Sequence, residues 1–136
     1  MSFKETLKEN NANRIKYKGD LARSLIKSSE EAILTAHSIK ITDSTLKSIF
    51  RELYEAFRQY CEAIGYMRGY ELINHNVITL FLSDVLKERT ISSRFETYTK
   101  IRKGINSGNH LGRKTVEGAL REVPRITSHL RKYMYP

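Results

Sequence analysis

The sequence predicts an all-α protein, a single four- or five-helix up-and-down bundle that spans residues 1–136. Apolar residues recur every three or four positions over long stretches, which is the period of an amphipathic helix. Stretches that alternate apolar with polar residues are few, so we expect no strand. No linker or repeat divides the chain, and its 136 residues suffice to bury roughly two thirds of the unfolded surface around one core.

The first helical region is predicted from about Ser2 to Ser38. Asn10, Asn11 and Asn13 favour a break near its start, and Gly19 weakens it further because glycine loses the most backbone entropy in a helix. The later part has a face of small and short apolar side chains, which lets another helix approach closely. That face consists of Leu21, Leu25, Ser28, Ala32 and Ala36.

The second helix is the clearest prediction. Thr42 or Asp43 can cap its first amides, and Gly65 and Gly69 bracket its end. Its apolar residues follow one stripe. They are Leu46, Ile49, Phe50, Leu53, Phe57, Tyr60, Cys61 and Ile64.

A third helix is expected after Tyr70, with Asn74 as its cap. Its apolar residues are Ile78, Phe81, Leu82 and Val85. The link from the second helix is short, and short links favour antiparallel neighbours.

A fourth helix is expected to begin at Thr90, Ser92 or Ser93. From Gly104 onward the sequence is a poor helix former, so we expect the helix to end there. Its apolar stripe is Phe95, Tyr98, Ile101 and Ile105. A fifth helix is predicted to begin at Thr115, with Glu117 in its first turn and a kink at Pro124.

The chain is strongly basic, with 24 Lys and Arg against 15 Asp and Glu and a net charge of +9. Residues 100–136 hold nine basic and two acidic residues, so +7 of that charge lies there. An excess of this kind favours RNA or another polyanion as partner. The alternative is a solvated basic face with no partner.

The remaining composition excludes several classes of protein. The only cysteine, Cys61, lies on an apolar stripe, so we expect a buried structural thiol and no disulfide framework. No Cys/His cluster has zinc-ligand spacing, and no glycine-rich phosphate loop is present, so we expect neither metal nor cofactor. The start is charged and no apolar run approaches a membrane span, which favours a cytoplasmic protein with no membrane contact.

Two segments carry a resemblance to a known family. YCEAIGYMRGYELINHNVITLFLSDVL (Tyr60–Leu86) and FETYTKIRKGIN (Phe95–Asn106) resemble the HEPN domain superfamily, in particular its small stand-alone archaeal and bacterial members. In that family the second helix ends in an alanine- and glycine-containing stretch. A Gly-aromatic pair and an Asn/Ser-His pair then open the next helix, and a later helix carries Arg-Asn with a polar partner downstream. The resemblance covers about the last two thirds of the chain.

The resemblance implies a HEPN-like bundle that forms a homodimer. Many members are metal-independent endoribonucleases in toxin–antitoxin, CRISPR or antiviral systems, so an antitoxin partner is one expectation. Others bind nucleotides, or act as non-catalytic modules that partner a minimal nucleotidyltransferase. RNA or nucleotide binding is therefore the leading hypothesis, and a protein-interaction module is the alternative.

Catalytic members of the family carry Arg, usually a polar residue after it, and His four to six positions on. Matching that motif gives Arg102 and Lys103, but the histidine position falls near Ser107. Three arrangements stay open. His110 reaches the site if the intervening glycines unwind the helix, Arg68 and His75 form the pair on another helix, or catalysis is absent.

The chemistry of metal-free RNA cleavage needs a proton acceptor, a cation for the phosphorane and a proton for the leaving oxygen. Histidine, with an ordinary pKa of about 6.5, suits proton transfer at neutral pH, and arginine matches phosphate through its planar fork. The candidate catalytic residues are therefore Arg102, His110 and His75. The candidate nucleic-acid-binding residues are Arg102, Lys103, Asn106, Arg113, Lys114 and Arg68.

Each of these residues has a structural alternative. Arg102 can pair with Glu96 or Glu62 on the surface, and His75, next to Asn74, can serve as a helix cap. Most tyrosines are expected to pack on helix faces, with Tyr66 and Tyr70 the candidates for stacking on bases.

Overall fold

The computed structural model describes residues 1–9 and 12–135 and is mostly helical. In chain order its α-helices are α1 (Phe3–Lys8), α2 (Gly19–Ser38), α3 (Leu46–Met67), α4 (His75–Leu80), α5 (Arg89–Asn106) and α6 (Arg113–Leu130). Its strands are β1 (Ala12–Arg14) and β2 (Tyr70–Leu72), and a π-helical turn (Phe81–Val85) and a 3-10 turn (Arg131–Tyr133) follow α4 and α6. The predicted all-α class is confirmed apart from the small sheet.

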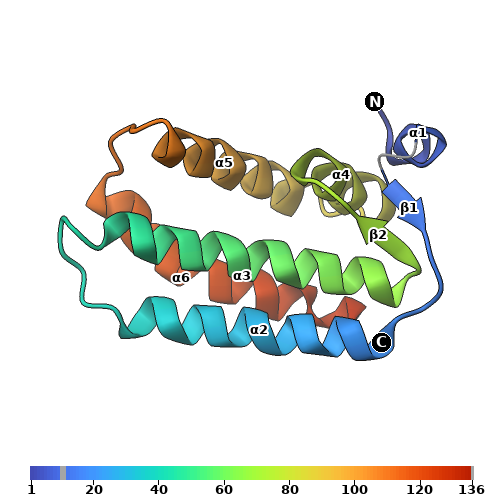
Figure 1. The fold of residues 1–136 in the computed structure, drawn as a ribbon, viewed down its shortest axis with the longest axis horizontal. Helices are drawn as coiled ribbons and strands as arrows, with labels where there is room; N and C mark the ends of the chain where they lie inside the picture. Colours follow the sequence, from blue (N-terminus) through green and yellow to red (C-terminus); the bar gives the residue numbers. More distant parts are fainter. Residues whose placement is uncertain (10–11, 136) are drawn as a thin grey trace.

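The four long helices form the body of the molecule (Figure 1). Helix α3 packs against α2, α5 and α6, so it is the central helix. Loops 39–45 and 107–112 lie together at one end of the bundle, while α1 and the sheet lie toward the other. No helix in the described part of the chain combines the length and apolar character that crossing a membrane requires.

The expectation of no strand was wrong. β1 pairs antiparallel with β2, with Ala12 opposite Leu72, and the amide of Ile15 continues the pairing to the Gly69 carbonyl at 2.8 Å. Ala12 and Leu72 are both buried. Three-residue strands give little period-2 signal, and their pairing joins distant parts of the sequence, so the local pattern does not reveal it.

The first helical region is two helices, with Asn13 in β1 between them. Asn10 and Asn11 lie outside the described residues. Gly19 begins α2 and does not interrupt a helix. The small face is shifted from the predicted one, because Leu21 is 39% exposed. The buried residues of α2 are Gly19, Ala22, Ile26, Ser29, Ala32 and Ala36.

Helix α3 begins at Leu46, three to four residues later than predicted. Thr42 and Thr45 form a turn instead, in which the Thr45 hydroxyl donates to the Lys40 carbonyl at 2.7 Å. All eight residues of the predicted apolar stripe are buried. Gly65 stays inside the helix, and Gly69, at φ +81°, ends it in the left-handed conformation that glycine tolerates best.

The core joins α3 to α5 through aromatic rings. Phe57 packs edge-on against Phe95 and Tyr98, with ring centroids 5.0 and 5.5 Å apart, and Tyr54 stacks on Phe95 at 5.7 Å. The free Cys61 thiol is buried, as predicted. These contacts place the middle of α5 beside the middle of α3.

Helix α4 confirms the predicted cap, because the Asn74 side chain accepts the Val77 amide at 3.0 Å. Helix α5 begins at Arg89 without a side-chain cap, and its Ser92 hydroxyl donates to the Thr79 carbonyl at 2.7 Å. The predicted end at Gly104 was wrong, because α5 continues to Asn106.

Helix α6 begins at Arg113, two residues before the predicted Thr115, and it continues through Pro124 to Leu130. Proline has no amide for the carbonyl of Leu120, four residues earlier. His37 Nε2 lies 3.0 Å from that oxygen, and its Nδ1 lies 2.8 Å from the Ile33 carbonyl. With a proton on Nε2, His37 donates from α2 the hydrogen bond that the proline lacks.

Candidate functional site

Arg102 lies in the last turn of α5 and is partly exposed. Its guanidinium donates to Asn106 Oδ1, one turn further on. The structural alternative was wrong, because Glu96 pairs with Lys100 and Glu62 with Arg58. In the described part of the chain no carboxylate lies within 4 Å of Arg102, so its charge can serve a bound anion.

The charge of Arg102 also reaches the α3–α5 contact. Burial raises the pKa of the Tyr54 phenol, while a hydrogen bond with Thr99 and the charges of Arg58 and Arg102 oppose the rise. Arg102 is therefore near enough to Tyr54 for its charge to act on that phenol.

Lys103 and His75 form one of the contacts between α5 and α4. Lys103 Nζ lies 3.1 Å from His75 Nε2. An ammonium only donates, so Nε2 must accept, which requires a neutral imidazole with its proton on Nδ1. Burial and the positive charge of Lys103 both lower the pKa of His75. At neutral pH His75 is thus a proton acceptor.

The two contacts are adjacent along the chain, because Lys103 follows Arg102. The Arg102–Asn106 pair and the Lys103–His75 pair together place two cations, an amide and a basic imidazole at the end of α5. This set contains a phosphate-binding fork and a proton acceptor.

His110 lies in the loop between α5 and α6 and is exposed. The helix does not unwind to bring it closer. Gly108, at φ +83°, ends α5 with Asn109 N–H bonded to the Gly104 carbonyl (2.8 Å) and Gly108 N–H bonded to Ile105 (3.1 Å), which is a Schellman cap. His110 instead lines a cavity of about 440 Å³ with Asp43 and Lys47.

Arg68 is not brought to His75. It ends α3, and its guanidinium lies over the ring of Tyr133, 5.6 Å from the centroid. Nothing in residues 1–9 and 12–135 hydrogen-bonds Arg68 to His75. Tyr70, a candidate for stacking on bases, packs instead against the core. Its ring lies edge-on to Phe3 and Phe81, with ring centroids 5.1 and 6.1 Å apart.

Arg113 and Lys114 begin α6 beside the same loop. Arg113 donates to the Ile41 carbonyl at 3.3 Å and lies 3.9 Å from Glu117, so it ties α6 to the α2–α3 loop. Lys114 has no carboxylate partner within the described residues. We use the term basic end for the cations at this end of the bundle, namely Lys47, Arg102, Lys103, Arg113 and Lys114.

Sequence reasoning missed two parts of this arrangement. Lys47, in the first turn of α3, was not singled out, although its place next to a loop is visible in the sequence. The His75–Lys103 contact joins residues 28 positions apart, so neither the spacing of His75 to Arg68 nor its place beside Asn74 reveals it. The expected antiparallel course of neighbouring helices is the one signal that favours it.

The described residues contain no group of three or more His, Cys, Asp or Glu side chains that could hold a metal ion. Comparisons with protein-family models, with curated proteins and with solved structures found no match for this chain.

Proposed function

We propose that this chain is a HEPN-like protein that binds RNA or nucleotide phosphates at the basic end and cleaves RNA without a metal. The observation that carries the proposal is the 3.1 Å contact between Lys103 and His75, at the helix position next to Arg102. It supports a neutral histidine with one ammonium at a phosphate, and the Arg102 guanidinium is the second cation that we propose to turn toward that phosphate. As the resemblance implies, we expect the protein to act as a homodimer.

The proposed reaction uses these residues in sequence. A phosphate draws Lys103 away from His75, whose Nε2 then accepts the proton of the ribose 2′-OH. The 2′-oxygen forms a bond to the adjacent phosphorus, and Arg102 and Lys103 stabilise the phosphorane charge. The bond to the 5′-oxygen breaks, and that oxygen takes a proton from the Lys103 ammonium. The products are a 2′,3′-cyclic phosphate and a 5′-hydroxyl.

The alternative, a protein-interaction module, has less support. Of the exposed large apolar side chains of the described residues, Leu21 and Leu34 belong to α2 and Tyr17 lines a cavity with Leu21, while the others come from other parts of the chain. The full set is Met1, Tyr17, Leu21, Leu34, Ile73 and Tyr135.

The test is cleavage of labelled single-stranded RNA in EDTA by the wild-type protein and by Arg102→Ala and His75→Ala. Arg121→Ala is the matched control, because it removes an exposed cation from α6 outside the basic end. We expect cleavage by wild type and control, and a loss of roughly 100-fold or more in the other two. Equal cleavage by all four proteins, or none by wild type, would refute catalysis at this site.

A further inference from the structure

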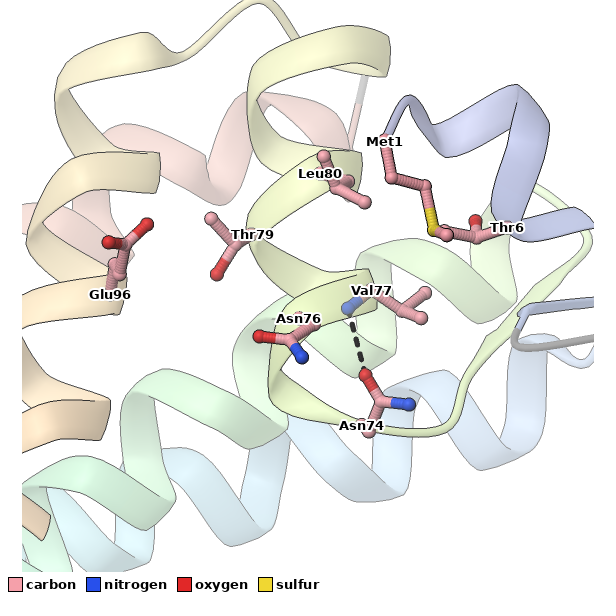
Figure 2. A pocket seen from close by; sticks show the side chains of 8 residues that line it. All are labelled: Met1, Thr6, Asn74, Asn76, Val77, Thr79, Leu80 and Glu96. Atoms are coloured by element: carbon pink, nitrogen blue, oxygen red, sulfur yellow. Dashed lines mark hydrogen bonds between the residues drawn. The ribbon is translucent and has the colours of Figure 1, made fainter. Parts of the chain in front are cut away.

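A cavity of about 450 Å³ lies between α1, α4 and α5 (Figure 2). Its volume falls in the range of roughly 300–1,000 Å³ that is typical of small-molecule sites. Met1, Val77 and Leu80 supply apolar wall, and Asn76, Thr79 and Glu96 supply polar groups. Figure 2 shows the apolar side chains on the α1 side of α4 and Asn76, Thr79 and Glu96 on its α5 side, so the polar edge of a ligand fits the α5 side.

The polar groups of this cavity have unused hydrogen-bonding capacity. Within the described residues, the Asn76 amide has no hydrogen-bond partner. The Thr79 hydroxyl donates to the His75 carbonyl at 2.9 Å, which leaves its oxygen free to accept. The Glu96 carboxylate lies 3.3 Å from Lys100 in an exposed pair, and such pairs are weak enough to yield to a ligand.

The cavity lies next to the proposed phosphate site along α4 and α5. Asn76 follows His75 directly, and the Thr79 hydroxyl is bonded to the His75 backbone. On α5, Ser92 contacts Thr79, Glu96 lines the cavity and Lys103 contacts His75. These three α5 residues share the face that is turned to α4.

Glu96 and Lys103 are two turns apart on that face, which is about 10 Å along the helix axis. A nucleotide spans such a distance from its phosphate to the far edge of its base. The carboxylate at one end repels phosphate and accepts N–H groups, while the ammonium at the other end attracts phosphate. These two charges therefore orient a bound nucleotide with its phosphate at Lys103 and its base toward Glu96.

We propose that this cavity is a base-recognition subsite that selects guanine in the nucleotide whose phosphate lies at Lys103 and Arg102. This inference rests on the proposed function. Guanine offers its N1–H and 2-amino group side by side, so one carboxylate can accept both. The other bases present at most one amino donor on that edge, beside an acceptor that a carboxylate repels. Asn76 and Thr79 complete the contacts with the base edge.

The experiment measures affinities of short single-stranded RNAs that differ at one position: guanine, inosine, which lacks the 2-amino group, or adenine. Wild type should prefer guanine by about tenfold or more over both. Glu96→Gln and Asn76→Ala should lose this preference and keep the affinity for the adenine RNA. Glu117→Gln, which removes an exposed carboxylate outside the cavity, should keep the preference. Thermal melts confirm that each variant is folded.

The outcomes separate the two proposals. RNA binding without base preference, or a preference that Glu96→Gln retains, overturns the guanine subsite and leaves the phosphate site intact. Guanosine, which has no phosphate, provides the second readout through the NMR signals of the Asn76 side-chain amide. If those signals shift in wild type and not in Glu96→Gln while no RNA binds, the subsite stands and the phosphate site fails. If RNA binding shows no guanine preference and guanosine does not shift the Asn76 signals, the subsite is overturned.

Discussion

Lys103 and His75, 28 residues apart in the chain, meet with 3.1 Å between Nζ and Nε2. The contact fixes the tautomer of the imidazole and holds the end of α5 against the start of α4. Burial lowers the pKa of His75, and the adjacent Lys103 ammonium lowers it further, because both disfavour the charged ring.

The first prediction concerns this pair. Lys103→Met removes the charge, so the pKa of His75 should rise toward its ordinary value of about 6.5. An NMR titration of the His75 ring protons measures the change. Arg121→Ala is the control and should leave the titration as in wild type. A pKa that falls or stays constant in Lys103→Met contradicts the contact.

The same shift predicts a pH dependence of stability. The folded-state pKa of His75 lies below its unfolded value, so between the two the unfolded chain binds more protons. The contribution of His75 to the free energy of unfolding therefore decreases as the pH falls through about 6.5. Denaturant unfolding at several pH values should give a smaller decrease for His75→Gln than for wild type. An equal decrease would assign the pH dependence to other groups.

A third prediction concerns the link between α5 and α6. Glu122 accepts three hydrogen bonds from Arg94, at 2.9, 3.0 and 3.1 Å, and one from the Tyr98 hydroxyl at 2.7 Å. Tyr98 is only 2% exposed, so Glu122→Ala leaves the buried Tyr98 hydroxyl without its acceptor. The change should lower the free energy of unfolding by about 1–3 kcal/mol. Glu117→Ala, at an exposed pair, should cost under about 0.5 kcal/mol. Similar costs for the two variants would contradict the network.

The fourth prediction tests how α6 accommodates Pro124. His37→Ala leaves the Leu120 carbonyl without a donor and should cost about 1 kcal/mol. Pro124→Ala restores the helical amide to that carbonyl, so in this background His37→Ala should cost much less. A double-mutant cycle from denaturant unfolding measures the coupling. Strictly additive effects would show that His37 does not compensate for the proline.

The sequence was most informative where structure is local. The apolar stripe of α3 follows from helical period alone, and the Asn74 cap depends on residues three positions apart. Cys61 is buried where that stripe places it, and its thiol pKa is raised by burial. These features required no knowledge of the rest of the chain.

The sequence was least informative where distant segments meet. β1 and β2 pair across nearly sixty residues, and neither strand is long enough to show a pattern. The end of α5 was misplaced because three glycines suggested a break before Asn106, while one of them, Gly108, completes a cap. The His75–Lys103 contact depends on how α4 docks on α5, which helical period does not specify.

The most direct test of the central proposal is the salt dependence of single-stranded RNA binding. For single strands the slope of log K against log salt is about −0.7 for each phosphate neutralised. Arg102→Ala and Lys103→Ala should each weaken binding and make the slope shallower by about 0.7, while Arg121→Ala keeps the wild-type slope. Identical slopes in all four proteins, or no RNA binding by wild type, would contradict a phosphate site at the basic end.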